Sequence, residues 1–264
     1  MIARSHVSQA ARVRHRVRTH ACEWPAVYLP FARRKYPGPS PEVISLDTEF
    51  VIDGYTRCAS TFAVYALQLS QPRPIRLAHH LHAPAQLIQA ARSGVPALAV
   101  IREPQGAILS QLIQEPWVAL KDALVAYARF YECLLPYRGK LVVADFEQVT
   151  KDFGTVIRTV NVRFGTDFAE FVPTEPNVRR CFELIKHRDS LSTALLGFES
   201  GVVTWDELSR ELPALERDAR SPKPAAWIPS GERERSKAAL REQWQRPDLA
   251  RLRQRAERAY LAFR

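Results

Sequence analysis

The sequence predicts an α/β fold, with a central parallel sheet flanked by helices and followed by a helical C-terminal part. From residue 42 onward, short apolar stretches rich in β-branched residues alternate with segments of helical periodicity. Beyond Pro173 this alternation ends, and only helices and turns are expected. A length of 264 residues suits one such domain with peripheral helices.

The expected elements follow one another as strand and helix. Strands are expected over 43–52, ended by a turn at Asp53-Gly54, and over 96–101 and 140–145. Helices are expected over 60–71, 87–92, 105–113, 119–135 and 150–164. Further on, Thr204 and Glu207 predict a capping box for a helix that begins at Trp205. Residues 221–231 are expected to form a loop, and Ser230 to cap a basic helix.

Residues 1–41 are predicted to form a basic tail, and residues 42–264 a single domain. Residues 1–20 contain many arginines and no acidic residue, and they show no clean apolar helical face. A transit peptide would have this composition, but a solvated, poorly ordered tail is the simpler interpretation. Five prolines and Gly38 between Pro25 and Pro41 are expected to interrupt regular structure.

The composition is that of a globular protein with excess positive charge. Lys and Arg number 38 against 28 Asp and Glu, so the formal net charge is +10. This balance favours anionic partners, which include nucleic acid, an anionic membrane surface and a multiply charged small molecule. No segment has the length of a transmembrane helix or the pattern of a signal peptide, so we expect a cytoplasmic protein. The four cysteines lack metal-ligand spacing and are expected to be reduced: Cys22, Cys58, Cys133 and Cys181.

The first candidate site is the segment Gly54-Tyr55-Thr56-Arg57-Cys58-Ala59-Ser60-Thr61-Phe62, which follows an expected strand and opens an expected helix. A helix N-terminus offers unpaired N–H groups and the positive end of the helix dipole, so it binds phosphate. Arg57 adds a permanent charge, and Ser60 and Thr61 add hydroxyls in the first turn. By local pattern alone, Ser60 capping an ordinary helix explains the segment equally well.

Other details of this segment limit its interpretation. Nucleoside triphosphatases end their loop in Gly-Lys-Ser/Thr, with a hydroxyl that also holds magnesium, and that ending is missing here. Cys58 at a helix start is a candidate for a lowered thiol pKa, although a small residue that fills a tight loop explains it as well.

The second candidate site is Val100-Ile101-Arg102-Glu103-Pro104, which leads to Ser110. Open parallel sheets bind ligands at the carboxyl ends of their strands, so an arginine and a hydroxyl that converge there form a phosphate pocket. The alternative is an arginine that pairs with a nearby carboxylate.

Together the two segments resemble the nucleotide sulfotransferases. That family has a loop of the form Gly-x-x-Arg/Lys-Ser-Gly-Thr/Ser-Thr-Phe/Trp after its first strand, and an Arg-Asp-Pro with a serine eight residues after the arginine. The residues in step with these patterns are Arg57, Ser60, Thr61, Arg102, Pro104 and Ser110. The likeness covers about residues 45–168, where Tyr127–Tyr131 resembles the family's aromatic helix and 141–149 its strand running into an acidic turn. Cys58-Ala59 replaces the usual Ser-Gly, and Glu103 replaces the usual aspartate.

The resemblance implies a nucleotide-binding fold of the P-loop type and an enzyme that moves a sulfuryl group to an acceptor hydroxyl. The donor would be 3′-phosphoadenosine-5′-phosphosulfate (PAPS), used without a metal. Residues 57–62 would hold the phosphosulfate, with Arg57 also neutralising charge in the reaction, while Arg102 and Ser110 would hold the 3′ phosphate. Late in the chain, Arg233 with Lys237 would close over the 3′ phosphate, although a solvated basic helix explains them as well.

The expected general base lies in His79-His80-Leu81-His82, with His80 and His82 on one side of an extended segment. A metal site or a structural role for individual histidines remains open. Glu49 and Asp53 are fallback bases.

Two other functions remain open, a P-loop-like phosphotransferase such as a nucleotide kinase, and a non-enzymatic protein that binds nucleotide or nucleic acid. Nucleic acid is not the expected partner, because the terminal arginines lack interleaved aromatic residues that stack bases. The sequence leaves open both the oligomeric state and the acceptor, which residues 173–227 are expected to enclose.

Overall fold

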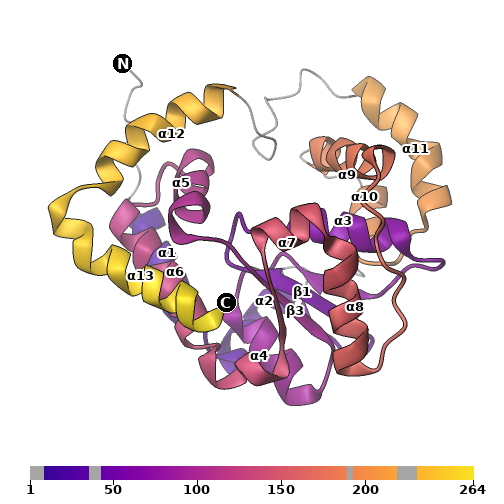
Figure 1. Ribbon diagram of the computed structural model, residues 1–264, viewed down its shortest axis with the longest axis horizontal. Coiled ribbons are helices and arrows are strands. Elements are labelled where there is room, and N and C mark those ends of the chain that lie inside the picture. Colours follow the sequence, from indigo (N-terminus) through magenta and orange to yellow (C-terminus); the bar gives the residue numbers. More distant parts are fainter. Residues whose placement is uncertain (1–8, 36–42, 189–192, 219–230) are drawn as a thin grey trace.

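The computed structural model describes residues 9–35, 43–188, 193–218 and 231–264, apart from the side chains of 214–218 and 232–233. At its centre lies a four-stranded sheet whose strands are all parallel, in the order β2-β1-β3-β4 (Figure 1). The strands are β1 (Phe50–Gly54), β2 (Leu77–His79), β3 (Ala97–Ile101) and β4 (Val142–Asp145). The predicted α/β class with a central parallel sheet is confirmed.

The strands of the sheet are buried on both faces. Every residue of β1, β2 and β3 is buried, the pattern expected of strands that are covered by helices above and below. Gly54 ends β1 opposite Val100 of β3, and a Cβ atom at Gly54 would lie 2.1 Å from the Val100 carbonyl oxygen. Only glycine therefore fits where the chain leaves β1 for the following loop.

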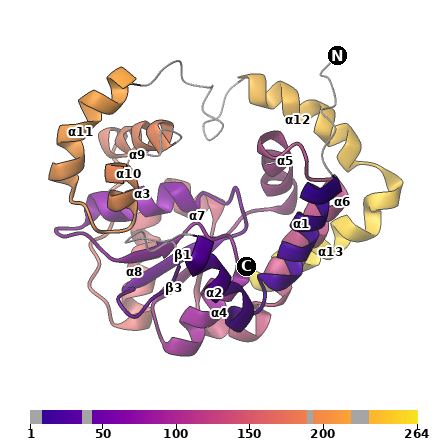
Figure 2. The ribbon, with the colours of Figure 1, turned by 180° about the vertical axis from the view of Figure 1, so that it is seen from behind.

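Helices cover both faces of the sheet and extend beyond it (Figures 1 and 2). Helix α3 packs on β1 and β2, and α4 on β1 and β3. At the C-terminal end, α13 packs on α6 and α12 on α5, which confirms the predicted helical C-terminal part. The helices are α1 (Gln9–Ala21), α2 (Pro25–Lys35), α3 (Ser60–Ser70), α4 (Pro84–Ser93), α5 (Pro104–Gln114), α6 (Leu120–Glu132), α7 (Phe146–Lys151), α8 (Phe153–Phe164), α9 (Glu175–His187), α10 (Thr193–Glu199), α11 (Trp205–Asp218), α12 (Gly231–Trp244) and α13 (Ala250–Phe263), with 3₁₀ helices η1 (Leu135–Lys140) and η3 (Pro247–Leu249).

The expectation of a poorly ordered N-terminal tail is wrong for residues 9–35, which form α1 and α2. Pro25 is the first residue of α2, where a missing N–H group costs nothing. Tyr28, Leu29 and Ala32 of α2 are buried, and α2 packs on α4. Glu23, between the helices, forms a two-pronged ion pair with Arg129 of α6 at 2.6 and 2.7 Å. The apolar side of α2 and this ion pair hold the segment on the domain.

Other element boundaries also differ from the prediction. The first strand begins at Phe50 rather than residue 43, and Ile44 donates its N–H to the Gln86 side chain instead of to a neighbouring strand. Asp53 and Gly54 form the end of β1 and not a turn, and β2, which includes His79, was not predicted. The expected helix over 150–164 is divided by Asp152, which caps α8 through the Thr155 N–H.

The predicted capping box at the start of α11 is confirmed. Thr204 and Glu207 each accept a hydrogen bond from the other's backbone N–H, at 3.2 and 2.7 Å. Ser230 and most of the loop expected over 221–231 lie outside the described residues. Among the described helices, none has the length and apolar composition needed to span a bilayer.

Candidate functional site

The structure brings the two predicted phosphate-binding segments together at the carboxyl edge of the sheet. Loop 55–59 leaves β1, and Arg102 follows the neighbouring strand β3. The Arg102 Nη1 donates to the Arg57 carbonyl oxygen at 3.3 Å, and the Arg57 Nε donates to the Ser110 Oγ at 3.0 Å. Three of the predicted residues, Arg57, Arg102 and Ser110, therefore form one cluster.

Ser60 does not act as the helix cap that the local pattern allowed. The N-cap position of α3 is Ala59, which makes no side-chain cap, and Ser60 is the first helical residue. The Ser60 Oγ is buried and has no hydrogen-bond partner among the described residues. An unsatisfied buried hydroxyl costs roughly 1–3 kcal/mol. An anion at the start of α3 would accept a hydrogen bond from this hydroxyl and from the unpaired backbone N–H groups beside it.

Backbone strain is concentrated at the same place. In the described part of the chain, the non-glycine residues with positive φ are Arg57, Ala59, His80 and His82. Such a conformation costs about 1 kcal/mol or more for each residue with a Cβ atom, and it persists where the surroundings enforce it. Ala59, with φ 75°, stands where the loop pattern that this segment resembles has glycine. The loop therefore keeps the left-handed conformation at an energetic cost.

The other predicted loop residues have different environments. The Thr61 Oγ1 lies 2.9 Å from His80 Nε2, so this hydroxyl links the loop to the histidine segment. Phe62 is buried against Phe171 and Phe182, and its side chain contributes to the core rather than to the loop surface. Burial raises the pKa of the Cys58 thiol to about 12, so the suggestion that a helix start lowers this pKa is wrong. Cys58 acts as a small filler of a tight loop.

Arg102 is oriented by aromatic residues that the sequence interpretation did not assign to the site. Its Cζ lies 4.0 Å from the centroid of the Phe146 ring, a cation–π distance. The Tyr127 hydroxyl donates to the Arg102 carbonyl at 2.5 Å. The Glu103 side chain caps α5 by accepting from the Gly106 N–H at 2.8 Å, so the replacement of aspartate preserves a local structural role.

Tyr131, one turn after Tyr127 on α6, connects the two segments. Its hydroxyl donates to the Val100 carbonyl at 3.0 Å and accepts from the Tyr55 N–H at 3.2 Å. The i, i+4 spacing of the two tyrosines was the available signal for this role, because it places both on one face of the helix. Gln114, also unassigned, accepts from Arg57 Nη1 at 3.0 Å.

His82 has the geometry of a general base. Its Nδ1 lies 2.9 Å from the Gly54 carbonyl oxygen and 3.6 Å from Asp53 Oδ1, and both oxygens are acceptors. Nδ1 therefore carries the proton, which leaves the lone pair on Nε2. The side chain is 27% exposed and lines the cavity described below. Burial is the main cause that lowers the pKa of His82 to about 4, so the ring is neutral at pH 7.

His80 is more strongly engaged by its neighbours. Its Nε2 contacts Thr61, and its Nδ1 lies 2.5 Å from His79 Nδ1 and 3.9 Å from Glu199 Oε2. One possible ligand atom from each of His79, His80 and Glu199 lies within 4.8 Å of the other two. Glu199 Oε1 also accepts from Arg188 at 2.8 Å, and this guanidinium opposes a cation at the cluster.

The fallback bases occupy unsuitable positions. Asp53 is fully buried, and its Oδ1 accepts from the backbone N–H groups of Gly54 and His82 at 2.9 and 3.1 Å. Asp53 therefore holds the His82 turn in place rather than facing a ligand. Glu49 precedes β1 at the edge of the sheet opposite the loop, where it pairs with Arg73 at 2.6 Å.

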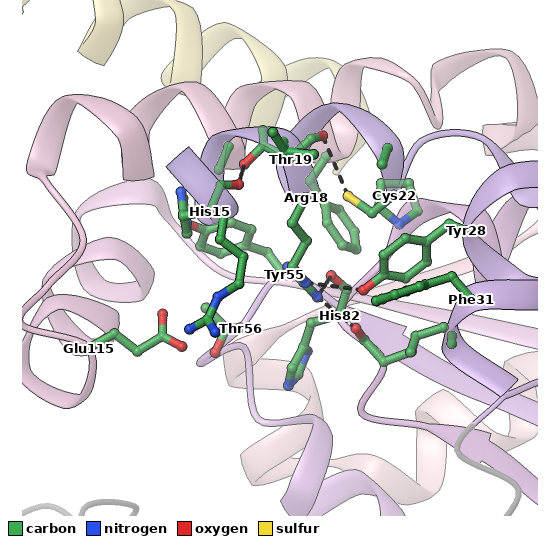
Figure 3. Close-up of a pocket in the computed structure, with 18 of the residues that line it drawn as sticks. His15, Arg18, Thr19, Cys22, Tyr28, Phe31, Tyr55, Thr56, His82 and Glu115 are labelled. Atoms are coloured by element: carbon green, nitrogen blue, oxygen red, sulfur yellow. Dashed lines mark hydrogen bonds between the residues drawn. The ribbon is translucent and has the colours of Figure 1, made fainter. Parts of the chain in front are cut away.

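A cavity of about 910 Å³ adjoins the loop at Thr56 and the histidine segment at His80 and His82. Its apolar walls come chiefly from α1, α2 and α6 and include Val17, Val27, Tyr28, Phe31 and Phe130. His15 and Glu115 also line it, and Figure 3 shows them with Arg18 and Tyr28 around the cavity. Among the described residues of 173–227, none lines this cavity, so this part of the segment expected to enclose the acceptor does not border the space.

Arg18 of α1 fastens the cavity wall to the histidine segment. Its Nη2 donates to the carbonyl oxygens of Leu81 and His82 at 2.9 and 3.1 Å, and its Nε donates to the Tyr28 hydroxyl at 3.1 Å (Figure 3). The basic N-terminal segment is thus part of the structure around the candidate base.

No protein-family model matches this chain, and no curated protein matches it. Among solved structures, the chain is similar to mouse sulfotransferase SULT7A1 complexed with PAP, over 75% of this chain and 92% of that chain. The TM-score is 0.35 and the sequence identity is 11%. A likeness this distant decides neither the fold nor the function, for which the sheet order and the site geometry of this chain are the relevant observations.

The predicted late contact to the 3′ phosphate stays a prediction. Arg233 belongs to α12, but its side chain lies outside the described part of the structure. Lys237 pairs with Glu234 of the same helix at 2.6 Å.

We expect the free energy of unfolding to fall steeply between pH 6.5 and 4. Burial lowers the pKa of His79 to about 3, of His82 to about 4 and of His80 well below 6.5, so unfolding takes up three protons in this range. Burial raises the pKa of Asp53 to about 7, so this carboxyl loses one proton on unfolding and offsets part of the effect. A net uptake of about two protons gives a slope of about 2.7 kcal/mol per pH unit.

Urea unfolding at several pH values measures this slope. In the His82→Asn variant, unfolding should take up about one proton fewer, because that side chain no longer titrates, and the slope should fall accordingly. A free energy of unfolding that stays constant from pH 7 to 5 would contradict the neutral, buried state of the three histidines.

Proposed function

We propose that this chain is a sulfotransferase that moves a sulfuryl group from PAPS to an acceptor hydroxyl. The observation that carries the proposal is the convergence of Arg57, Arg102 and the Ser60 hydroxyl at the carboxyl ends of β1 and β3, where no described residue hydrogen-bonds to that hydroxyl. A nucleotide with phosphate groups at two positions has a partner for each in this cluster. Spacing in the sequence and proximity in the fold agree on the same residues.

The donor's two phosphate ends would use different parts of the cluster. The start of α3, with Arg57, Ser60 and Thr61, offers N–H groups and hydroxyls to the 5′ phosphosulfate. Arg102 and Ser110 would hold the 3′ phosphate, with Arg102 kept in place by Phe146 and Tyr127. The bond between Arg57 and Ser110 would then open or rearrange as the anion enters.

In the proposed reaction, the acceptor oxygen forms a bond to sulfur as the bond between sulfur and the phosphate oxygen breaks. The electron pair of the broken bond leaves with adenosine 3′,5′-bisphosphate, and the acceptor proton passes to His82 Nε2. Arg57 would stabilise the charge that develops on the leaving oxygen. Fixed positive charge and positioning supply most of the acceleration in a loose transition state of this kind.

The cavity beside His82 would hold the acceptor. Its mostly apolar wall suits an alcohol or phenol with an apolar body, and about 910 Å³ is room for a molecule of drug size or larger. The His15 Nδ1 is buried without a partner among the described residues and offers the cavity a polar contact away from the loop.

Thermal unfolding with different nucleotides tests the proposal. Adenosine 3′,5′-bisphosphate at about 100 times its Kd should raise the Tm by about 5–10 °C, since binding adds about 2.7 kcal/mol of stability. ATP with magnesium and an RNA oligomer should give a much smaller shift. A shift with magnesium–ATP alone would instead indicate a phosphotransferase, and a shift with RNA alone a nucleic-acid-binding protein.

A further inference from the structure

The surface of α1, α2 and the turn between them carries an unusual number of exposed apolar side chains. Of the twelve large hydrophobic side chains that are exposed in the described residues, five lie between residues 9 and 35. Their exposures are 52–64%, and the five are Val13, Val17, Trp24, Val27 and Phe31. Exposed apolar side chains gathered in one place mark an interaction surface.

Four of these side chains line two adjoining hollows. Val17 and Trp24 line one shallow hollow together with Arg16, His20 and Ala21. Val17 also borders the large cavity beside the loop, as do Val27 and Phe31 of α2. Val17 therefore connects the Trp24 end of the surface to the mouth of the cavity. Figure 2 shows α1 on the outside of the molecule, in front of α6.

The same surface is strongly basic. The sequence of α1 contains four arginines and that of α2 ends in Arg33-Arg34-Lys35, while neither helix contains an acidic residue. Arg18 is bound to the carbonyl oxygens of Leu81 and His82, and Arg16 pairs with Asp122 at 3.1 Å, so Arg12 and Arg14 supply most of the charge that α1 offers to an anionic partner. Glu23 lies between them and is paired with Arg129. Exposed Val, Trp and Phe side chains with basic residues around them are the composition of helices that lie in the headgroup region of an anionic bilayer.

We propose that the α1–α2 surface binds the face of an anionic lipid bilayer, with the mouth of the cavity directed toward it. The phosphates of a nucleic acid could pair with the arginines. A nucleic acid would not bury Val13, Val17 and Val27, because these side chains have no planar face on which a base could stack. A second copy of this chain would bring like charges together. A bilayer satisfies both features, because headgroup phosphates meet the arginines while Trp24 and Phe31 enter the acyl boundary.

A consequence for the acceptor rests on the proposed sulfotransferase function. Because Val17, Val27 and Phe31 are shared by the bilayer-binding surface and the cavity wall, an amphiphilic alcohol could pass from lipid to His82 along apolar contacts. The acceptor class would then be a lipid or other membrane amphiphile with a hydroxyl at its polar end. Bilayer binding itself requires no donor nucleotide and is measured without one.

Co-sedimentation of the full chain with vesicles tests the proposal. Binding is expected to vesicles of equal parts phosphatidylglycerol and phosphatidylcholine, and to fall at least tenfold on pure phosphatidylcholine. The pair Trp24→Ser and Phe31→Ser should weaken binding to the anionic vesicles by about tenfold or more. The control pair Val162→Ser and Leu261→Ser removes apolar side chains from α8 and α13 that are at least as exposed as Trp24 and Phe31, and it should leave binding unchanged.

The pair Arg12→Gln and Arg14→Gln should also weaken vesicle binding by about tenfold, while Arg163→Gln with Arg251→Gln should not. Unchanged melting temperatures verify that the variants fold. Equal loss in test and control pairs, or absence of vesicle binding by the unmodified chain, would overturn the proposal. So would tight RNA binding that depends on Arg12 and Arg14 but not on Trp24, together with weak vesicle binding.

Discussion

Replacing Arg102 by alanine is expected to weaken the binding of adenosine 3′,5′-bisphosphate by about 100-fold. The substitution removes a charge-assisted contact to a partly desolvated phosphate and leaves that phosphate without its fixed partner. It also removes the hydrogen bond to the Arg57 carbonyl, so the loop after β1 loses part of its support. Isothermal titration calorimetry on the two proteins measures the change.

Arg92 provides the matched control for this variant. Its guanidinium also lies over an aromatic ring, at 5.5 Å from the centroid of Tyr137, but it belongs to the last turn of α4. Arg92→Ala should therefore keep the affinity within a few-fold. Arg57→Ala is expected to keep much of the binding, because the N–H groups of α3 remain, but to lose transfer rate. An Arg102→Ala protein with unchanged affinity would show that Arg102 does not hold a phosphate of the nucleotide.

Replacing His82 by asparagine is expected to lower kcat by about 10²-fold, the low end of the usual contribution of a general base, because burial lowers the pKa of His82 to about 4 and makes the ring a weak base at pH 7. Asparagine tolerates the positive φ of 47° at this position, and its amide can still donate to the Gly54 carbonyl in place of Nδ1. The change therefore removes the Nε2 lone pair with little change to the turn. Affinity for the bisphosphate should stay the same.

The companion variant His80→Asn separates the two predicted catalytic histidines. Asparagine again suits a positive φ, here 56°, but the variant loses the contact between His80 and Thr61. We expect a smaller loss of kcat than for His82→Asn, together with weaker nucleotide binding through Thr61. The opposite order of effects on kcat would make His80 the base, and full activity of both variants would exclude the histidine segment from proton transfer.

The site residues that could be predicted from the sequence are those that belong to short, local sequence patterns. The first pattern is a strand followed by small residues and hydroxyls around the start of a helix at Ser60. The second is an arginine that directly follows the buried strand ending at Ile101. Each pattern depends only on neighbouring residues. Because parallel strands present their carboxyl ends on one edge, the adjacency of Arg57 and Arg102 followed from these two patterns.

Other features depend on long-range packing and were not predictable from local sequence. Helix α1 was not predicted because its many arginines gave residues 1–20 the composition of a solvated tail. Its stability comes from tertiary contacts, such as that of Arg18 to Leu81, which the local sequence does not show. The three-residue strand β2 is too short to show a period. The cavity is formed by helices that are distant from the loop in sequence, so no single segment of the chain predicts it.

A crystal structure of the chain with adenosine 3′,5′-bisphosphate would show whether one nucleotide contacts both arginine-bearing segments. We expect the 5′ phosphate at the start of α3, within hydrogen-bond distance of the Ser60 hydroxyl, and the 3′ phosphate beside Arg102 and Ser110. A nucleotide that contacts only one of these segments, or that binds elsewhere on the molecule, would contradict this expectation.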